Sequence, residues 1–139
     1  MAQKIREIMT TSLVCLDASE TVSDAAKAMK EHGIGDVLVM SSDELCGVLT
    51  DRDLTVRVLA EDRDPKSTRL DDVCSHEVAT LSPDDDVDRA VQLVRERAVR
   101  RIPIVEKGRP IGVVSIGDLA VERDETSALA DISAAPPNS

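Results

Sequence analysis

Gly47-Val48-Leu49-Thr50-Asp51-Arg52-Asp53 and Gly112-Val113-Val114-Ser115-Ile116-Gly117-Asp118 are one pattern, Gly-x-x-[Thr/Ser]-x-x-Asp, written twice at a distance of 65 residues. The repetition extends outward from these turns without a gap, so that residues 5–56 align with residues 70–121. A repeat of this length is a supersecondary unit that buries its apolar faces by packing against its twin. A site built by one copy is therefore expected to have a counterpart in the other.

Each copy reads as strand, helix, strand, strand, helix. In the first copy Thr21 and Asp24 have the spacing of a helix N-terminal capping box, and Gly33 is a C-terminal stop. Around this helix we expect a short helix or turn at 5–12, strands at 13–16, 37–40 and 45–49, and a second helix over 51–61.

The second copy is expected to have the same order of strands and helices. Its expected elements are a strand at 78–81, a helical face of Val87, Ala90, Val91 and Val94, strands at 102–105 and 111–114 joined by Lys107-Gly108, and a helix opening near Gly117.

The fold class that follows is α/β (α+β), with two β-α-β-β-α repeats. We expect the two repeats to share one hydrophobic core rather than to form two independent domains, because about 60 residues form only a marginal core alone. The predicted boundaries are repeat 1 at 1–61, a polar linker at 62–68, repeat 2 at 69–124, and a partly disordered tail at 125–139.

Composition narrows the function classes. The chain has 139 residues, 27 acidic and 17 basic, for a net charge of −10. A duplex-binding protein needs clustered cations, so we expect neither a nucleic-acid partner nor docking on anionic membranes. No run reaches the roughly 20 apolar residues of a spanning helix, and no basic-then-apolar leader opens the chain. The expectation is a soluble cytoplasmic protein.

The cysteines and histidines give no metal pattern. Cys15, Cys46 and Cys74 are odd in number and lack a Cys-x-x-Cys spacing, which favours buried free thiols in a reducing compartment. His32 and His76 complete no recognisable zinc spacing with them. No metal site is predicted. The chain also lacks Phe, Tyr and Trp, so a bound base would lie between aliphatic side chains rather than on a ring.

The repeated turn has two compatible interpretations. Ser/Thr-x-x-acid is a capping box, in which the hydroxyl accepts a backbone N–H and the acid bonds back. The same helix N-terminus offers unpaired N–H groups and partial positive charge to a phosphate. A hydroxyl there can donate to phosphate, and the carboxylate one turn later can accept from ribose hydroxyls. Duplication of the turn makes ligand binding credible.

With Ile8-Met9-Thr10 opening the first copy and Arg100-Arg101-Ile102-Pro103-Ile104-Val105 in the second, the chain resembles a tandem pair of cystathionine-β-synthase (CBS) domains over about residues 3–124. We expect a stand-alone CBS protein, with no catalytic or transporter domain beside the pair. The layout is similar to that of the small hypoxic-response CBS proteins of actinobacteria.

The resemblance implies two repeats related by a pseudo-two-fold axis, with clefts between them that bind AMP, ATP or S-adenosylmethionine. It implies a homodimer and no required cofactor. The chain has no Ser–His–acid or Cys–His arrangement with supporting motifs and no dinucleotide or Walker-type glycine loop, so we expect no enzymatic activity. Asp53 and Asp118 would hold ribose hydroxyls, and Thr50 and Ser115 would contact phosphate or ribose. The cations that would meet phosphates are Arg100, Arg101 and Arg52.

The two copies differ where those cations stand. The counterpart of Arg100-Arg101 is Gly35-Asp36, and the counterpart of Arg52 is Gly117. We therefore expect tight nucleotide binding in one cleft at most. Empty clefts in a scaffold or stress-response protein that acts through its surface are the alternative. Two further charged sets read as solvated surface: Arg95 with Arg97, and Asp84-Asp85-Asp86 with Asp88 at a helix start.

Overall fold

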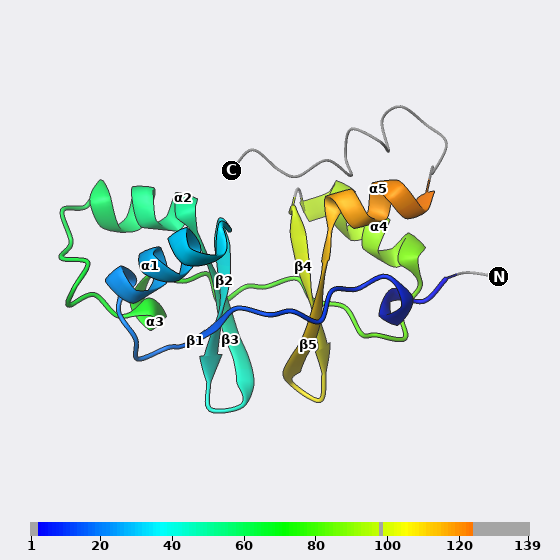
Figure 1. Ribbon diagram of the computed structural model, residues 1–139, viewed down its shortest axis with the longest axis horizontal. Helices are drawn as coiled ribbons and strands as arrows, with labels where there is room; N and C mark the ends of the chain where they lie inside the picture. The colour runs from blue at the N-terminus through cyan, green and yellow to red at the C-terminus, as the bar shows by residue number, and fades with distance from the viewer. Residues whose placement is uncertain (1–2, 98, 124–139) are drawn as a thin grey trace. The chain divides into compact units, whose positions relative to one another are not determined.

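The computed structural model describes residues 3–97 and 99–123. These residues form a mixed α/β structure with small sheets covered by helices (Figure 1), as the sequence predicts. They divide into two compact units. The first unit is residues 14–78, and the second combines residues 3–13 with the described residues from 79 onward. The predicted tail at 125–139 lies outside the described residues.

The first unit is a three-stranded sheet with helices on one side (Figure 1). Strand β1 runs parallel to β2, and β2 pairs antiparallel with β3. Its elements in chain order are β1 Cys15–Asp17, α1 Val22–His32, β2 Asp36–Ser41, β3 Glu44–Thr50, α2 Asp51–Asp53, the π-helical segment η2 Leu54–Leu59, and α3 Leu70–Val73.

The ends of α1 confirm the signals read from the sequence. The Thr21 side chain accepts from the Asp24 N–H, and the Asp24 carboxylate accepts from the Thr21 N–H at 3.1 Å. Gly33 ends the helix in the left-handed region at φ 65°, a conformation that glycine adopts without steric cost. The helix predicted over 51–61 continues past α2 as π-helix rather than α-helix.

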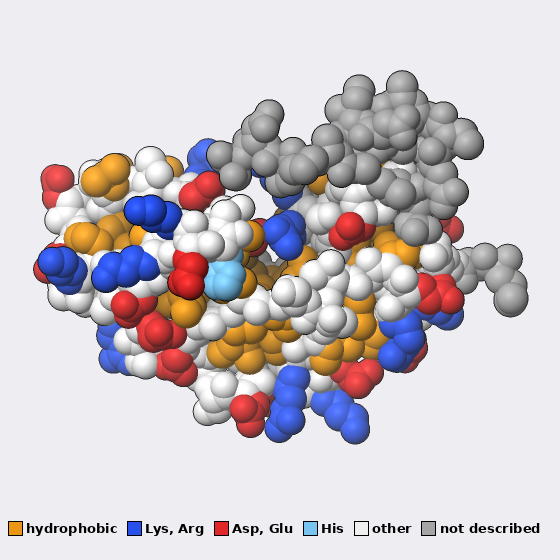
Figure 2. Space-filling model, viewed as in Figure 1, with side chains coloured by type: hydrophobic (Ala, Val, Ile, Leu, Met, Phe, Trp, Pro, Cys, Tyr) orange, Lys and Arg blue, Asp and Glu red, His pale blue; other side chains and the backbone are white. Residues whose placement is uncertain are grey.

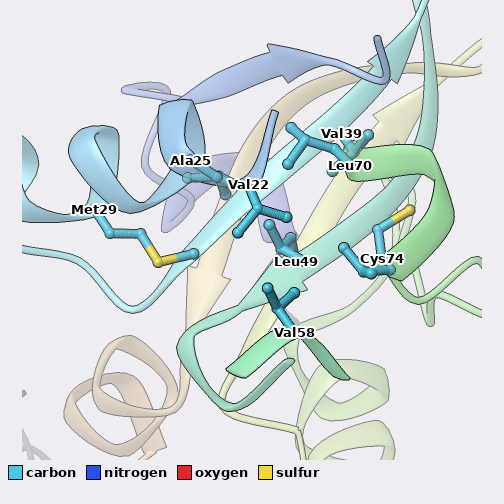
Figure 3. Close-up of a cluster of buried hydrophobic side chains, with 10 residues drawn as sticks. Val22, Ala25, Met29, Val39, Leu49, Val58, Leu70 and Cys74 are labelled. Atoms are coloured by element: carbon cyan, nitrogen blue, oxygen red, sulfur yellow. The ribbon is translucent and has the colours of Figure 1, made fainter. Parts of the chain in front are cut away.

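The core of the first unit is aliphatic and contains side chains from both the sheet and the helices. Figure 3 shows Val22, Ala25 and Met29 of α1 pointing toward side chains of the sheet, of η2 and of the α3 region. The remaining labelled members are Val39, Leu49, Val58, Leu70 and Cys74. Because the chain has no aromatic residues, small branched side chains fill this space, and loss of one would leave a cavity.

The second unit pairs β4 Arg101–Glu106 with β5 Arg109–Ser115, covered by α4 Val87–Arg97 and α5 Ile116–Arg123 (Figure 1). Residues 3–13 contribute the short 3₁₀ helix η1 Ile5–Glu7. The strand predicted at 78–81 is reduced to one parallel bridge between Leu81 and Ile104. On α4, Leu93 is buried with Val87 and Ala90. The predicted Val91 and Val94 only pack partly buried against this core.

The boundaries of the units differ from those of the sequence repeats, because each hairpin is bordered by the segment that opens the other repeat. Thr10 and Val113 exchange main-chain hydrogen bonds of 2.9 and 2.8 Å. Ser75 and Val48, each the 65-residue counterpart of one of that pair, exchange two of 3.0 Å. An unpaired strand edge is costly, and this reciprocal pairing protects one edge of each hairpin.

The surface carries mixed charge. Figure 2 shows acidic and basic side chains interspersed over the visible face, with apolar side chains between them. Within the described ranges, no helix combines the length and apolar character needed to cross a bilayer. The thiols are free, as expected, but only Cys74 is buried. Cys15 is exposed and Cys46 is intermediate, so the prediction of buried thiols is wrong for Cys15.

Candidate functional site

The first of the two repeated turns lies where β3 ends and α2 begins. The Thr50 N–H donates to Asp53 Oδ2 at 2.9 Å, and the Asp53 N–H donates to Thr50 Oγ1 at 3.1 Å. Both halves of the capping box are therefore formed. The hydroxyl hydrogen of Thr50 is not needed for this box and can donate to a ligand oxygen.

The second turn has the same geometry. The Ser115 N–H donates to Asp118 Oδ2 at 2.9 Å, and the Asp118 N–H donates to Ser115 Oγ at 3.1 Å. The agreement between the turns shows that the repeat is preserved at the level of individual hydrogen bonds. The structure brings each hydroxyl onto its aspartate, as the spacing predicts.

Each capping aspartate uses only one of its oxygens in the box. Asp53 Oδ1 lies 3.7 Å from Arg57 Nε, and the Asp53 side chain is 15% exposed. In the described part of the chain, the hydrogen bonds of the Asp118 carboxylate are made through Oδ2. A carboxylate has lone pairs on both oxygens, so each turn keeps acceptor capacity that a hydroxyl-bearing ligand could use.

The residue before each hairpin is held at the start of the helix. The Ile116 N–H donates to the Arg100 carbonyl at 2.8 Å, and the Asp51 N–H donates to the Gly35 carbonyl at 2.9 Å. In the second unit this places Arg100 beside the Ser115 turn, and Arg101 pairs in register with Ser115. Both arginines are exposed. The structure therefore places both arginines next to the Ser115 turn, and their contact with phosphates stays a prediction.

The first unit has acids at the same place. A Cβ on Gly35 would lie 3.0 Å from Asp51 Oδ2, so the Asp51 carboxylate covers this position. Asp36 pairs in register with Thr50. Arg52 is exposed on α2. Like charges repel an incoming phosphate, so these acids disfavour an anion at the first turn, and the inequality of the two sites stays a prediction.

The run of acids that the sequence analysis assigned to solvated surface makes contacts at the start of α4. Asp84 forms an ion pair with Arg6 at 3.0 Å, and Asp86 forms one with Lys4 at 3.1 Å. Asp85 accepts from the Ser82 N–H at 2.8 Å. These contacts tie η1 to the start of α4. A surface hollow of about 330 Å³ lies farther along α4, and none of the predicted site residues lines it.

A second constellation, which sequence reasoning missed, lies in the first unit. Cys46 of β3 meets Asp71 of α3 and His76, which follows that helix, and their ligand atoms all lie within 4.8 Å of one another. Cys74 Sγ adds a contact of 3.6 Å to His76 Nε2. These residues come from segments about 25–30 positions apart, so no local spacing motif reveals them.

The pKa values of both thiols in this constellation are raised above the ordinary value of a cysteine. Burial raises the pKa of Cys74 to about 11, and negative charge on Cys46 and Asp71 adds to the shift. Burial also raises the pKa of Cys46, with a further contribution from its hydrogen bond to the Asp71 carboxylate. In both cases desolvation and neighbouring negative charge disfavour the thiolate.

Comparison with known proteins agrees with the repeat and the fold. The CBS domain family model matches residues 5–60 and 70–125, and the chain belongs to this family. It is thus a pair of CBS domains, a regulatory module that typically binds nucleotide-like ligands.

Individual relatives include short proteins of the same layout. The CBS domain-containing protein YhcV of Bacillus subtilis is 35% identical over 86% of this chain and 84% of its own. Hypoxic response protein 1 of Mycobacterium tuberculosis is 30% identical over 83% of this chain and 81% of its own. The resemblance to hypoxic-response CBS proteins is therefore confirmed.

Two solved structures extend the comparison. The crystal structure of Hypoxic Response Protein I with two coordinated zinc ions has a TM-score of 0.79 at 29% identity, covering 86% of this chain and 98% of its own. A hexameric CBS-CP12 protein from bloom-forming cyanobacteria has a TM-score of 0.74 at 28% identity, covering 89% and 74%.

Proposed function

We propose that this protein is a regulatory module that binds an adenosine-type nucleotide, such as AMP, ATP or S-adenosylmethionine, at the repeated turns of its CBS domains. The observation that carries the proposal is the pair of matching turns at helix starts. In each turn a hydroxyl caps the helix, and one oxygen of the aspartate carboxylate accepts the N–H of the capping residue. The spare carboxylate oxygen suits ribose hydroxyls, and the helix N-terminus suits a phosphate. The role is regulatory rather than catalytic.

The turn in the second unit is the stronger candidate. Arg100 and Arg101 supply cations next to Ser115 and Asp118, whereas the first unit places Asp51 at the equivalent position. Arg52 and Asp53 would contribute to weaker binding there. We expect one nucleotide per chain with Asp118 on the ribose.

A thermal-shift panel of AMP, ADP, ATP, NADH and S-adenosylmethionine tests this proposal. A ligand that binds only the folded state stabilises it by about 2.7 kcal/mol at a hundredfold excess over Kd. The chain has no Trp or Tyr, so the assay uses an external dye or calorimetry. Asp118→Ala and Asp53→Ala form a matched pair, because both remove the same cap contact.

The ligand-induced shift, rather than the melting temperature itself, is the quantity to compare, since either variant loses its capping box. We expect Asp118→Ala to abolish the shift and Asp53→Ala to retain most of it. An equal, unchanged shift in both variants would contradict the site. A flat response of the wild-type protein to the whole panel would instead favour a ligand-free scaffold or stress-response protein.

Self-association is part of the proposal. Val56 and Leu59, on η2, are 47% and 73% exposed, and apolar side chains of this size on a helix surface suit a partner helix. The CBS-CP12 protein of similar fold is hexameric, which supports self-association. We expect a homodimer that transmits ligand binding to a protein partner in the cytoplasm. Light scattering over a range of concentrations measures the assembly directly.

A further inference from the structure

The constellation of Cys46, Asp71 and His76 has the dimensions of a small metal site. Cys46 Sγ lies 3.6 Å from Asp71 Oδ1, which lies 3.7 Å from His76 Nε2. Cys74 Sγ is 3.6 Å from the same imidazole nitrogen. With Zn–S bonds of about 2.3 Å and Zn–N or Zn–O bonds of about 2.0–2.2 Å, tetrahedral ligand atoms stand roughly 3.4–3.8 Å apart. These three separations fall within that range, and the ligand atoms of Cys46, Asp71 and His76 all lie within 4.8 Å of one another.

The imidazole of His76 has more acceptors around it than a neutral ring can satisfy. Its Nδ1 lies 3.2 Å from the Cys46 carbonyl oxygen, and its Nε2 lies 3.0 Å from the Asp71 carbonyl oxygen. A neutral imidazole carries one N–H, so it donates to one carbonyl and leaves a lone pair on the other nitrogen. Donation from Nδ1 to Cys46 would fix the ring with Nε2 toward Asp71 and Cys74, as in metal-binding histidines.

The four side chains of this constellation differ in their exposure to solvent. Cys74 is 3% exposed, whereas the side chains of Asp71 and His76 are 54% and 52% exposed. An ion can therefore enter from solvent and meet a buried sulfur. Gly47 keeps the space open, because a Cβ there would lie 2.9 Å from Cys74 Sγ.

The fold does not require these side chains, as the other repeat demonstrates. The counterparts of Cys46 and Cys74 are Ile111 and Met9, and these apolar residues pack against the core of the second unit. The counterparts of Asp71 and His76 are Arg6 and Thr11. The same backbone thus accepts ordinary packing residues, so the ligand-type residues of the first unit need another explanation.

We propose that Cys46, Asp71, Cys74 and His76 bind one zinc ion. Two sulfurs with an imidazole and a carboxylate are ligands that zinc accepts in tetrahedral sites, and soft thiolates disfavour Mg²⁺ and Ca²⁺. The positive charge of the ion would compensate the negative charges of the Asp71 carboxylate and of the Cys46 and Cys74 thiolates. It would also fasten β3 to the segment after α3, four residues before Thr50. This inference is independent of nucleotide binding.

The test uses the full chain, treated with a chelator and then titrated with Zn²⁺ or with Co²⁺ as a spectroscopic probe. Because the chain has no aromatic residues, thiolate-to-cobalt charge-transfer absorption in the near ultraviolet is unobscured. We expect one ion per chain, charge-transfer absorption, intense visible bands of tetrahedral cobalt, and a higher melting temperature with Zn²⁺.

Matched variants locate the ion. Cys46→Ser and His76→Gln should weaken Zn²⁺ binding more than about tenfold and remove the tetrahedral cobalt spectrum. Cys15→Ser and His32→Gln change the same residue types outside the site and should bind as the wild type does. Cys74→Met introduces the side chain that the other repeat carries at this position, so it should fold and still lose affinity.

Three results would overturn the proposal. One is a wild-type chain that takes up no Zn²⁺ from a competing chelator of micromolar affinity. Another is an octahedral cobalt spectrum without thiolate charge transfer. The third is an equal loss of binding in Cys15→Ser and Cys46→Ser, which would indicate nonspecific thiol chemistry.

Discussion

Gly112→Ala tests the exchange of opening segments between the repeats. A Cβ at Gly112 would lie 2.9 Å from the Thr10 carbonyl oxygen and 2.8 Å from Met9 Sδ. The Met9 side chain can move, but the Thr10 carbonyl is fixed by its own hydrogen bond from the Val113 N–H at 2.8 Å. The new methyl group must therefore push residues 9–10 away from the edge of β5.

The expected cost follows from these contacts. Overpacking of this kind costs about 1–3 kcal/mol, and weakening the two Thr10–Val113 hydrogen bonds adds about 1 kcal/mol. Replacing glycine by alanine returns about 0.4–1 kcal/mol through the unfolded chain. We expect a net loss of about 2 kcal/mol in the free energy of unfolding. For a chain of this size the melting temperature should fall by about 8 °C.

Urea unfolding followed by far-ultraviolet circular dichroism measures the change, and Gly35→Ala is its matched control. There the new Cβ meets only the Asp51 carboxylate, at 3.0 Å, which is exposed and can rotate. We expect Gly35→Ala to stay within about 0.5 kcal/mol of the wild type. If Gly112→Ala is as stable as Gly35→Ala, residues 9–10 do not pack on this hairpin and the reasoning fails.

Three further outcomes follow from local geometry. Thr21→Ala removes the cap of α1 and should cost about 1 kcal/mol in urea unfolding, whereas an unchanged midpoint would mean that the cap is not formed. The hydrogen bonds from Thr21 lower the pKa of Asp24, so its stabilising contribution is present above the unfolded-state pKa and lost as pH falls through the folded-state value. Melting temperatures of Asp24→Asn and wild type should therefore converge in acid, and a constant gap would refute this linkage. Leu59→Glu places a charge on a side chain that is 73% exposed and should shift light scattering toward monomer with little change in unfolding, while an intact assembly would exclude this surface from the interface.

The elements that the sequence predicted well are those with local causes. Thr21, Asp24 and Gly33 delimit α1 through contacts within a few residues, and Thr50 with Asp53 forms its capping box across three. The same reasoning transferred by the repeat to Ser115 and Asp118. Capping and turn conformations depend mainly on neighbouring residues, so they can be read before the fold is known.

The predictions from the sequence were wrong or incomplete for features that depend on contacts between residues far apart in the chain. The strand expected at 78–81 retains one bridge, because strand formation depends on the edge that is available to it. The metal-type constellation was missed since Cys46 and His76 are 30 residues apart and no spacing motif covers them. The burial of each cysteine also followed from packing rather than from residue type.

By itself, the sequence determined that the chain is a doubled unit, where α1 and α2 begin, and which residues stand at the repeated turn, because all of these rest on periodicity and short-range hydrogen bonds. Tertiary structure decided the rest. It alone paired residues 10 and 75 with the other repeat's hairpin, and it brought two thiols, an imidazole and a carboxylate close together. Such features depend on which segments meet in space, and chain spacing does not encode that directly.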